Sequence, residues 1–201
     1  AEVHHFKYIY QELAARGWTI LFAAKRKDVA EALLVAYDLP HVIFSESKKG
    51  LFKKVLHVPV ELWRFARIVR RFRPTFIFSN LSIHSSWISF LFRITHIAFI
   101  DTEHRRVLDY VTLPFADVKL TPRAYKRRLG HNHVRYSGNH EVAYLHPLWR
   151  TPDPSIKGLL GVNEDEKYVL LRFVGWHAFH DAGLHGIEFA KKLQLVERLA
   201  Q

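Results

Sequence analysis

The feature of this sequence that most constrains its fold is the alternation of short apolar runs with longer amphipathic segments. Apolar runs of strand length and composition lie at residues 18–24, 41–44, 75–79, 97–100, 118–120 and 133–136. Segments with helical periodicity lie beside them, at residues 2–16, 28–38, 55–72 and 85–92, and residues 45–54 are predicted to form a polar, basic loop. Strands that alternate with helices are typical of a parallel sheet covered on both faces. The sequence therefore predicts an α/β fold, a Rossmann-like doubly wound parallel sheet.

Some elements of this pattern are predicted in finer detail. Pro59 is expected to interrupt the helix over residues 55–72, because a proline ring clashes with the preceding helical turn. A short helix is expected at residues 125–129. Farther along, residues 167–174 are predicted to form a strand and residues 187–200 an amphipathic helix.

The prolines in the last third of the chain predict a domain boundary. Pro147, Pro152 and Pro154 interrupt the pattern, and we expect residues 146–166 to be a linker. Residues 1–145 would then form a Rossmann-like N-terminal domain. Residues 167–201 hold one predicted strand and one helix, fewer than the roughly 40 residues that fold unaided, so we expect them to begin a second Rossmann-like domain that is truncated.

The charge of the chain indicates the chemistry of its partners. The 201 residues carry a formal net charge of +11, which points to phosphorylated small molecules, acidic membrane surfaces or nucleic acid. The absence of cysteine excludes disulfides and thiolate metal sites. Few cysteines and methionines with many charges are typical of thermophile proteins. A chain without methionine does not begin at a translation start, so we expect a fragment.

No motif predicts a common nucleotide or hydrolase site. The sequence lacks a P-loop, a GxGxxG fingerprint, a GxSxG elbow and an HExxH pair, which argues against kinases, simple dehydrogenases and α/β-hydrolases. No apolar run is long enough to cross a bilayer, and no signal peptide is visible. We expect a cytoplasmic protein, with at most peripheral membrane contact, and neither a cofactor nor a metal.

The main candidate site follows the run at residues 97–100. This run ends abruptly in Asp101, Glu103, His104 and Arg105, at the carboxyl end of a predicted strand, where open α/β sheets bind ligands. We expect Asp101 and Arg105 to contact a substrate, and Glu103 and His104 to act as catalytic acid or base. Alternatively, the two acids only complement the dipole of a following helix.

Two other strand ends supply further candidates. Asn80 and Ser82 follow the run at residues 75–79, and Gly138 follows the run at residues 133–136. Serines at the start of a helix directly after a strand can form an anion site, because free backbone amides point outward there. We expect these three residues to line the cleft, although such serines are often only helix caps.

Histidines form two more candidate groups. His177, His180, Asp181 and His185 lie between the last predicted strand and helix. Their spacing resembles a set of metal ligands but matches no strict zinc pattern, so we expect a substrate-binding loop that faces the cleft between the domains. His4 and His5 would lie at the start of the first helix, where a ligand can approach, or are ordinary surface histidines.

The long predicted helix carries a basic face. Arg64, Arg67, Arg70 and Arg71 lie opposite its apolar side. We interpret this helix as packed on the core with a solvated basic face. The functional alternative is contact with anionic lipid headgroups, to which the neighbouring Trp63, Phe52 and Lys53 would contribute.

Four segments of the sequence resemble a known family. They read IDTEH, LPFADVKLTPRAY, YSGNHEVAYLHP and YVLLRFVGWHAFHDAGLHGI. They are similar to the domain of unknown function 354 family, common in archaea and usually grouped with the UDP-N-acetylglucosamine 2-epimerases. The resemblance covers nearly the whole chain. It implies a glycosyltransferase-B architecture, two Rossmann-like domains facing each other across a nucleotide-sugar cleft, with the first strand before Ala1 and most of the second domain after Gln201.

The similarity to the true epimerases is partial. Their histidine-valine-glutamate-alanine-glycine motif falls on residues 100–104, so Glu103 matches a catalytic carboxylate, and their threonine-glycine-asparagine turn matches residues 137–139. Their glycine-aspartate-threonine acid falls at residues 79–81, where this chain has no carboxylate. A second glutamate is absent before Arg105. The resemblance thus implies nucleotide-sugar binding more firmly than epimerase chemistry.

We therefore predict a protein that binds a UDP-linked nucleotide sugar and an unknown acceptor, as a glycosyltransferase or an epimerase-like enzyme if it is active. The alternative is a non-catalytic basic module that binds RNA or an anionic membrane, with nucleic acid the less favoured partner. A third interpretation is a structural protein with an inactive site. Apolar sheet edges left by a truncation would also favour a homodimer.

Overall fold

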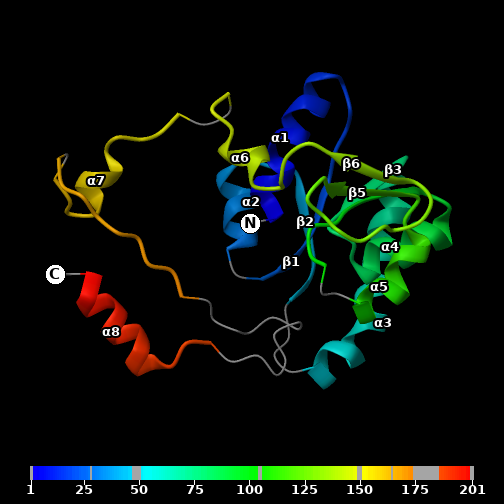
Figure 1. Cartoon of the computed structure of the whole chain (residues 1–201). Helices are drawn as coiled ribbons and strands as arrows, with labels where there is room; N and C mark the ends of the chain where they lie inside the picture. The colour runs from blue at the N-terminus through cyan, green and yellow to red at the C-terminus, as the bar shows by residue number, and fades with distance from the viewer. Residues whose placement is uncertain are drawn as a thin grey trace. The chain divides into compact units, whose positions relative to one another are not determined.

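The computed structural model describes residues 2–27, 29–46, 51–103, 106–148, 151–163, 165–173 and 186–199. The chain divides into two compact units, residues 1–150 (unit 1) and residues 151–201 (unit 2). Within the described residues, all of the strands belong to unit 1 (Figure 1). No helix in this described part is long and apolar enough to cross a membrane.

Helices and strands alternate along unit 1, as the sequence predicts. Their order is α1 (Glu2–Ala15), β1 (Phe22–Arg26), α2 (Ala30–Ala36), β2 (His41–Glu46), α3 (Leu51–Phe72), β3 (Phe76–Ser79), α4 (Ile83–Phe92), β4 (Thr95–Phe99), α5 (Arg106–Thr112), the 3-10 helix η1 (Leu113–Phe115), β5 (Val118–Pro122), β6 (His133–Tyr136) and α6 (Val142–Leu145). Unit 2 contains α7 (Ile156–Leu159) and α8 (Phe189–Leu199).

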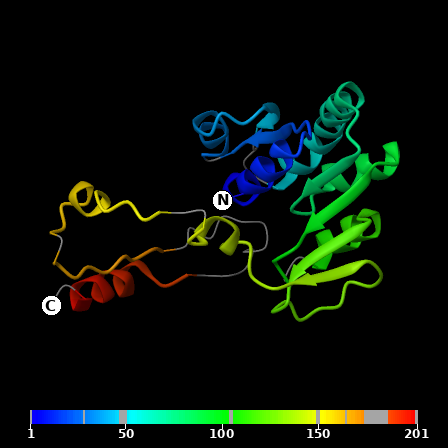
Figure 2. The same ribbon diagram turned by 90° about the horizontal axis from the view of Figure 1, so that it is seen from above.

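Every strand pair in the described residues is parallel. β1 pairs with β2, and β3, β4, β5 and β6 follow one another in a four-stranded sheet. The strands of this larger sheet, drawn in green, lie side by side in Figure 2. The predicted α/β, Rossmann-like character is confirmed, although the strands form two sheets rather than one.

The smaller sheet is covered on both faces, as in a doubly wound fold. Ala24 of β1 packs in a core cluster with Val3 of α1 and Leu34 of α2. Its neighbour Ala23 packs instead against the core cluster that contains Phe65 and Val69 of α3. Successive residues of a strand point to opposite faces, so α1 and α2 cover one face of this sheet and α3 covers the other.

One core cluster joins the two sheets of unit 1. Phe44 of β2 and Ile77 of β3 are both buried in the cluster that holds Phe65 and Val69 of α3. Ile88 of α4 completes the cluster. Because α3 packs on strands of both sheets, the two sheets share one continuous core.

The predicted interruption of the long helix at Pro59 is wrong, since α3 runs unbroken from Leu51 to Phe72. Proline removes one backbone donor and frees the carbonyl four residues earlier, here that of Val55. Both Val55 and Pro59 are exposed, so water can satisfy this carbonyl. The helix therefore continues through Pro59, and its buried side stays packed on the core.

The predicted helix at residues 125–129 is also wrong, because this segment is irregular chain with a bend at Arg127. Its backbone groups bond elsewhere. The amide of Lys126 donates to the carboxylate of Glu103, and the carbonyls of Lys126 and Arg127 accept from the guanidinium of Arg135. These tertiary hydrogen bonds replace the helical ones.

In unit 2, α8 confirms the predicted terminal helix, but the predicted strand is not formed. Residues 167–173 have no regular secondary structure. A strand needs a neighbour to satisfy its backbone groups, and no described residue of unit 2 provides one. The predicted boundaries of the linker, residues 146–166, stay a prediction beside the observed division at residue 150.

Candidate functional site

A pocket of about 280 Å³ opens at the carboxyl ends of β4, β5 and β6. β4 ends at Phe99, β5 at Pro122 and β6 at Tyr136. Since these strands are neighbours and parallel, the loops that follow them meet at one edge of the sheet. The polar and aromatic side chains that line the pocket come from these loops: Asp101, Thr102, Glu103, Tyr125, Asn139, His140 and Glu141.

Asp101 and His140 form the central pair of this pocket. The His140 Nδ1 atom lies 3.1 Å from the Asp101 Oδ2 atom. The His140 side chain is buried, whereas that of Asp101 is half exposed. The hydrogen bond from His140 lowers the pKa of Asp101 to about 2, against the opposing effect of burial. Asp101 is therefore ionised at neutral pH, and His140 donates the bond.

This hydrogen bond fixes the tautomer of His140. A neutral imidazole that donates through Nδ1 carries a lone pair on Nε2. The Nε2 atom of His140 is buried and has no hydrogen-bond partner among the described residues. A buried polar atom without a partner is uncommon and costs stability. The Nε2 atom of His140 is thus an oriented, buried nitrogen that makes no hydrogen bond within the described part of the chain.

Aromatic rings hold His140 in place. The ring of His5, in α1, stacks on it with centroids 4.2 Å apart, and the ring of Tyr136 lies parallel to it at 6.1 Å. Burial lowers the pKa of His5 to about 4, with a further contribution from His140, while an interaction with Asn80 opposes the shift. His5 is therefore neutral near pH 7.

Glu103 is held by the segment that follows β5. Its Oε1 atom accepts from the backbone amide of Lys126 at 3.0 Å, and its carbonyl accepts from Arg127 at 3.0 Å. Arg127 also pairs with the buried Asp109 at 2.6 Å. These bonds fix the position of the Glu103 carboxylate at the rim of the pocket.

The structure brings some of the predicted site residues together. Asp101 and Glu103 both line the pocket. Gly138 lies two residues before His140, with a φ of +125° that side chains rarely tolerate. Asn80 is near the pocket, through its interaction with His5. Gly138 and Asn80 therefore belong to the surroundings of the pocket rather than to its lining.

Ser82 has a local role instead. It is the N-cap of α4, where its hydroxyl accepts from the amide of Ser85 at 3.1 Å. The remaining predicted residues, His104, Arg105, His177, His180 and Asp181, lie outside the described residues. Among the residues that are described, no group of histidines and acids is arranged to hold a metal ion.

Sequence reasoning missed His140 as a site residue. The signal was present, because His140 follows the turn after a predicted strand, as Asp101 does. His5 was considered for its position at the start of the first helix. Its role as a stacking partner for His140 depends on a contact between α1 and the turn after β6. These segments are far apart in the sequence, so no local pattern reveals the contact.

Comparison with known families agrees with this fold. A family model described as "Protein of unknown function (DUF354)" matches residues 1–200. The chain belongs to this family. A comparison with curated proteins finds no match. The pocket described above is thus a feature of a DUF354 protein whose chemistry has to be argued from its side chains.

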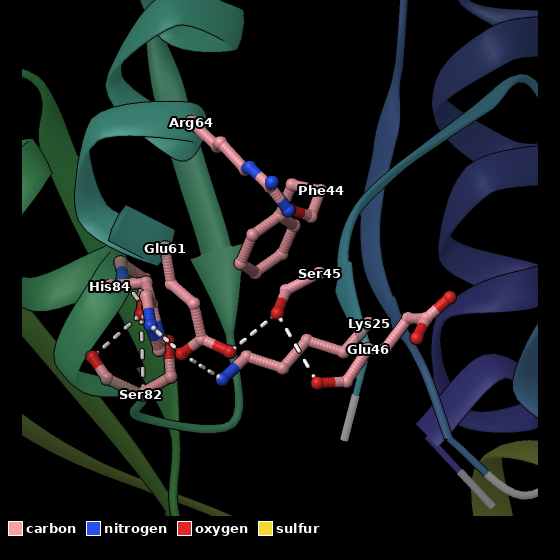
Figure 3. A network of polar contacts seen from close by, with 9 residues as sticks. Lys25, Phe44, Ser45, Glu46, Glu61, Arg64, Ser82 and His84 are labelled. Atoms are coloured by element: carbon pink, nitrogen blue, oxygen red, sulfur yellow. Dashed lines mark hydrogen bonds and ion pairs between the residues drawn. The ribbon is translucent and has the colours of Figure 1, made fainter. Parts of the chain in front are cut away.

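The DUF354 chain has a second polar cluster, centred on Glu61 of α3 (Figure 3). Lys25 of β1 lies 2.7 Å from Glu61 Oε2, His84 of α4 lies 2.9 Å from the same atom, and Ser45 of β2 lies 2.5 Å from Oε1. Figure 3 shows the three side chains pointing at the carboxylate from different elements. Sequence reasoning missed this cluster entirely.

Glu61 is ionised in this cluster although it is buried. Burial opposes ionisation, but hydrogen bonds from Lys25 and Ser45 outweigh it and hold the pKa of Glu61 below its ordinary value. Burial, and then the charge of Lys25, lower the pKa of His84. At neutral pH the DUF354 chain therefore holds one ion pair here, with a neutral imidazole and a hydroxyl completing the shell.

Proposed function

We propose that this DUF354 protein binds a nucleotide-activated sugar and uses His140 as the base that activates a hydroxyl group. The observation that carries the proposal is the buried Nε2 atom of His140, which has no partner among the described residues. Its ring is oriented by the Asp101 carboxylate at 3.1 Å. A base needs this combination of fixed geometry and a free lone pair.

The lining of the pocket favours hydroxyl groups as ligands. Asp101, Glu103 and Glu141 all contribute carboxylates. Carboxylates accept hydrogen bonds from sugar hydroxyls and repel phosphate. We therefore place a hydroxylated sugar or acceptor in this pocket. The nucleotide would be held mainly by the second Rossmann-like domain of the glycosyltransferase-B architecture that the family resemblance implies.

The reaction follows from these positions. The Nε2 atom of His140 takes the proton of an acceptor hydroxyl, and the ionised Asp101 stabilises the resulting imidazolium. The acceptor oxygen then bonds to the anomeric carbon of the sugar while the bond from that carbon to the diphosphate breaks. The nucleoside diphosphate leaves with the electron pair. One base and one orienting acid are sufficient for this transfer.

An epimerase-like reaction is the second candidate, supported by the position of Glu103. An epimerase-like reaction eliminates the nucleotide and adds it again, and so needs several acids and bases. Residues 79–81 provide no carboxylate where the epimerases have one. We therefore favour glycosyl transfer over epimerisation.

The test measures binding and chemistry separately. We expect UDP-N-acetylglucosamine or another nucleotide sugar to raise the thermal unfolding temperature of the protein, because a ligand that binds only the folded state stabilises it. With an acceptor present, His140→Gln should release nucleoside diphosphate about 100-fold to 10,000-fold more slowly than the wild type, and Asp101→Asn should also be slower. The matched control is His131→Gln, because His131 is exposed and does not line the pocket.

Two results would contradict the proposal. If no nucleotide sugar changes the unfolding temperature, the protein does not bind this class of ligand. If a nucleotide sugar binds and is turned over equally by the His140→Gln variant and the control, His140 is not the base.

A further inference from the structure

An exposed stripe of α3 combines large apolar side chains with arginines. Leu56, Val60, Trp63 and Arg67 follow one another at intervals of four, three and four residues, so they lie along one side of the helix. The three apolar residues are 63%, 41% and 58% exposed. We call these four residues the α3 stripe.

The opposite side of the same helix anchors it to the protein. Phe65 and Val69 are buried in the cluster that joins the two sheets, and Glu61 is bound to Lys25, Ser45 and His84. The helix is thus fixed by its buried side. It can present the α3 stripe to a partner without leaving the core.

Positive charge surrounds the α3 stripe. The guanidinium of Arg67 lies over the Trp63 ring at 5.0 Å, and Arg70 and Arg71 are exposed one turn farther along. Arg64 is exposed too, although it donates to the carbonyl of Phe44 at 3.4 Å. The single carboxylate in the sequence of α3 is Glu61, which is buried. The exposed side of α3 is therefore purely cationic and apolar.

We propose that the α3 stripe docks unit 1 on a lipid bilayer that contains anionic headgroups. Apolar residues with tryptophan insert at the boundary between headgroups and acyl chains, while arginines pair with the phosphates. A helix that lies flat on such a surface needs this composition along one side. The proposal is independent of the sugar pocket, because no residue of the α3 stripe lines it.

The charge and the residue types of the α3 stripe favour lipid over other occupants. In a two-fold contact between two copies, the α3 stripe and the arginines beside it would place like charges in one interface, among them Arg67 and Arg70 of both copies. RNA would pair with the arginines and stack on Trp63, but Leu56 and Val60 offer it neither stacking nor hydrogen bonds. A bilayer uses both the aliphatic and the cationic residues.

Vesicle flotation tests this proposal. We expect the protein to float with vesicles of phosphatidylcholine and phosphatidylglycerol in equal parts, and not with phosphatidylcholine alone. Arg67→Gln and Arg70→Gln should each lower the partition coefficient about five-fold, an effect that added salt reduces. The double variant Leu56→Gln, Trp63→Gln should lose most of the binding at any salt concentration.

The control variant is Phe90→Gln, Leu91→Gln on α4, where two apolar side chains are 67% and 69% exposed outside the α3 stripe. This control should float like the wild type, and circular dichroism should show that all variants are folded. The proposal fails if the control and the stripe variants lose binding equally, or if the protein ignores anionic vesicles. Binding to RNA alone, or concentration-dependent dimerisation abolished by the stripe variants, would also overturn it.

Discussion

Replacement of Glu61 should be among the most destabilising single substitutions in unit 1. Its carboxylate accepts from Lys25, Ser45 and His84, and so ties together β1, β2, α3 and α4. In Glu61→Ala the buried His84 imidazole loses its acceptor, and the Ser45 hydroxyl keeps only its bond to the carbonyl of Glu46 at 3.3 Å. A buried polar group left unpaired costs about 1–3 kcal/mol.

The magnitude follows from the exposure of each partner. Lys25 keeps 33% of its side chain accessible, so water can solvate its ammonium and its loss of the pair costs little. The side chains of Ser45 and His84 are nearly buried, but Ser45 keeps the Glu46 carbonyl as an acceptor, so the penalty of about 1–3 kcal/mol for an unpaired buried group falls on His84. We expect about 1–3 kcal/mol for Glu61→Ala.

Urea unfolding followed by circular dichroism measures this quantity. A lower midpoint with an unchanged m value would show that stability, and not compactness, has changed. The matched control is Glu46→Gln. It removes an exposed carboxylate of β2 that pairs with Arg26 of β1. We expect this control to change stability by less than about 1 kcal/mol. The reasoning is refuted if Glu61→Ala destabilises the protein no more than Glu46→Gln.

Two further predictions concern charge and pH. Burial lowers the pKa of both His5 and His96 to about 4, so the unfolded chain binds more protons than the native one between about pH 6.5 and pH 4. Their contribution is fully present above about pH 6.5 and is lost as the pH falls toward 4. Urea titrations across this range should show it, and His96→Asn should reduce the slope; a flat profile would contradict the assignment. Arg127→Met should destabilise the protein by about 3 kcal/mol, because Asp109 stays buried without its cation. Arg123→Met, which removes an exposed arginine in the same loop, is the control, and equal urea midpoints for the two variants would refute this role of Arg127.

The alternation of apolar runs was sufficient to predict most of unit 1. Each predicted run from residue 18 to residue 136 contains or overlaps an observed strand, because buried parallel strands are uniformly apolar and need no distant information. The errors occur where tertiary contacts decide. The segment after β5 bonds to Glu103 and Arg135 instead of forming a helix, and residues 167–173 lack a strand partner among the described residues.

The candidate site could be predicted only in part, for the same reason. Asp101 and Glu103 were found because residues just beyond a strand of a parallel sheet share an edge with its neighbours. Glu61 lies in the middle of a helix, where no such rule applies. A signal did exist, since Glu61 shares the buried stripe of α3 with Phe65 and Val69. A single carboxylate in an apolar stripe requires buried partners, but the sequence does not say which ones.

The two polar clusters differ in a way that separates stability from function. Every Glu61 oxygen has a partner, whereas His140 keeps a buried nitrogen without one among the described residues. Natural proteins retain a destabilising group, such as an unpaired buried nitrogen, where function requires it. His140→Phe keeps an aromatic ring beside His5 and Tyr136, removes the unpaired nitrogen, and leaves the half-exposed Asp101 to water. We expect this variant to be at least as stable as the wild type in urea while its nucleotide-sugar turnover is lost. A large loss of stability would mean that the Asp101–His140 hydrogen bond stabilises the fold. That result would contradict the proposal that the pocket is a site for proton transfer.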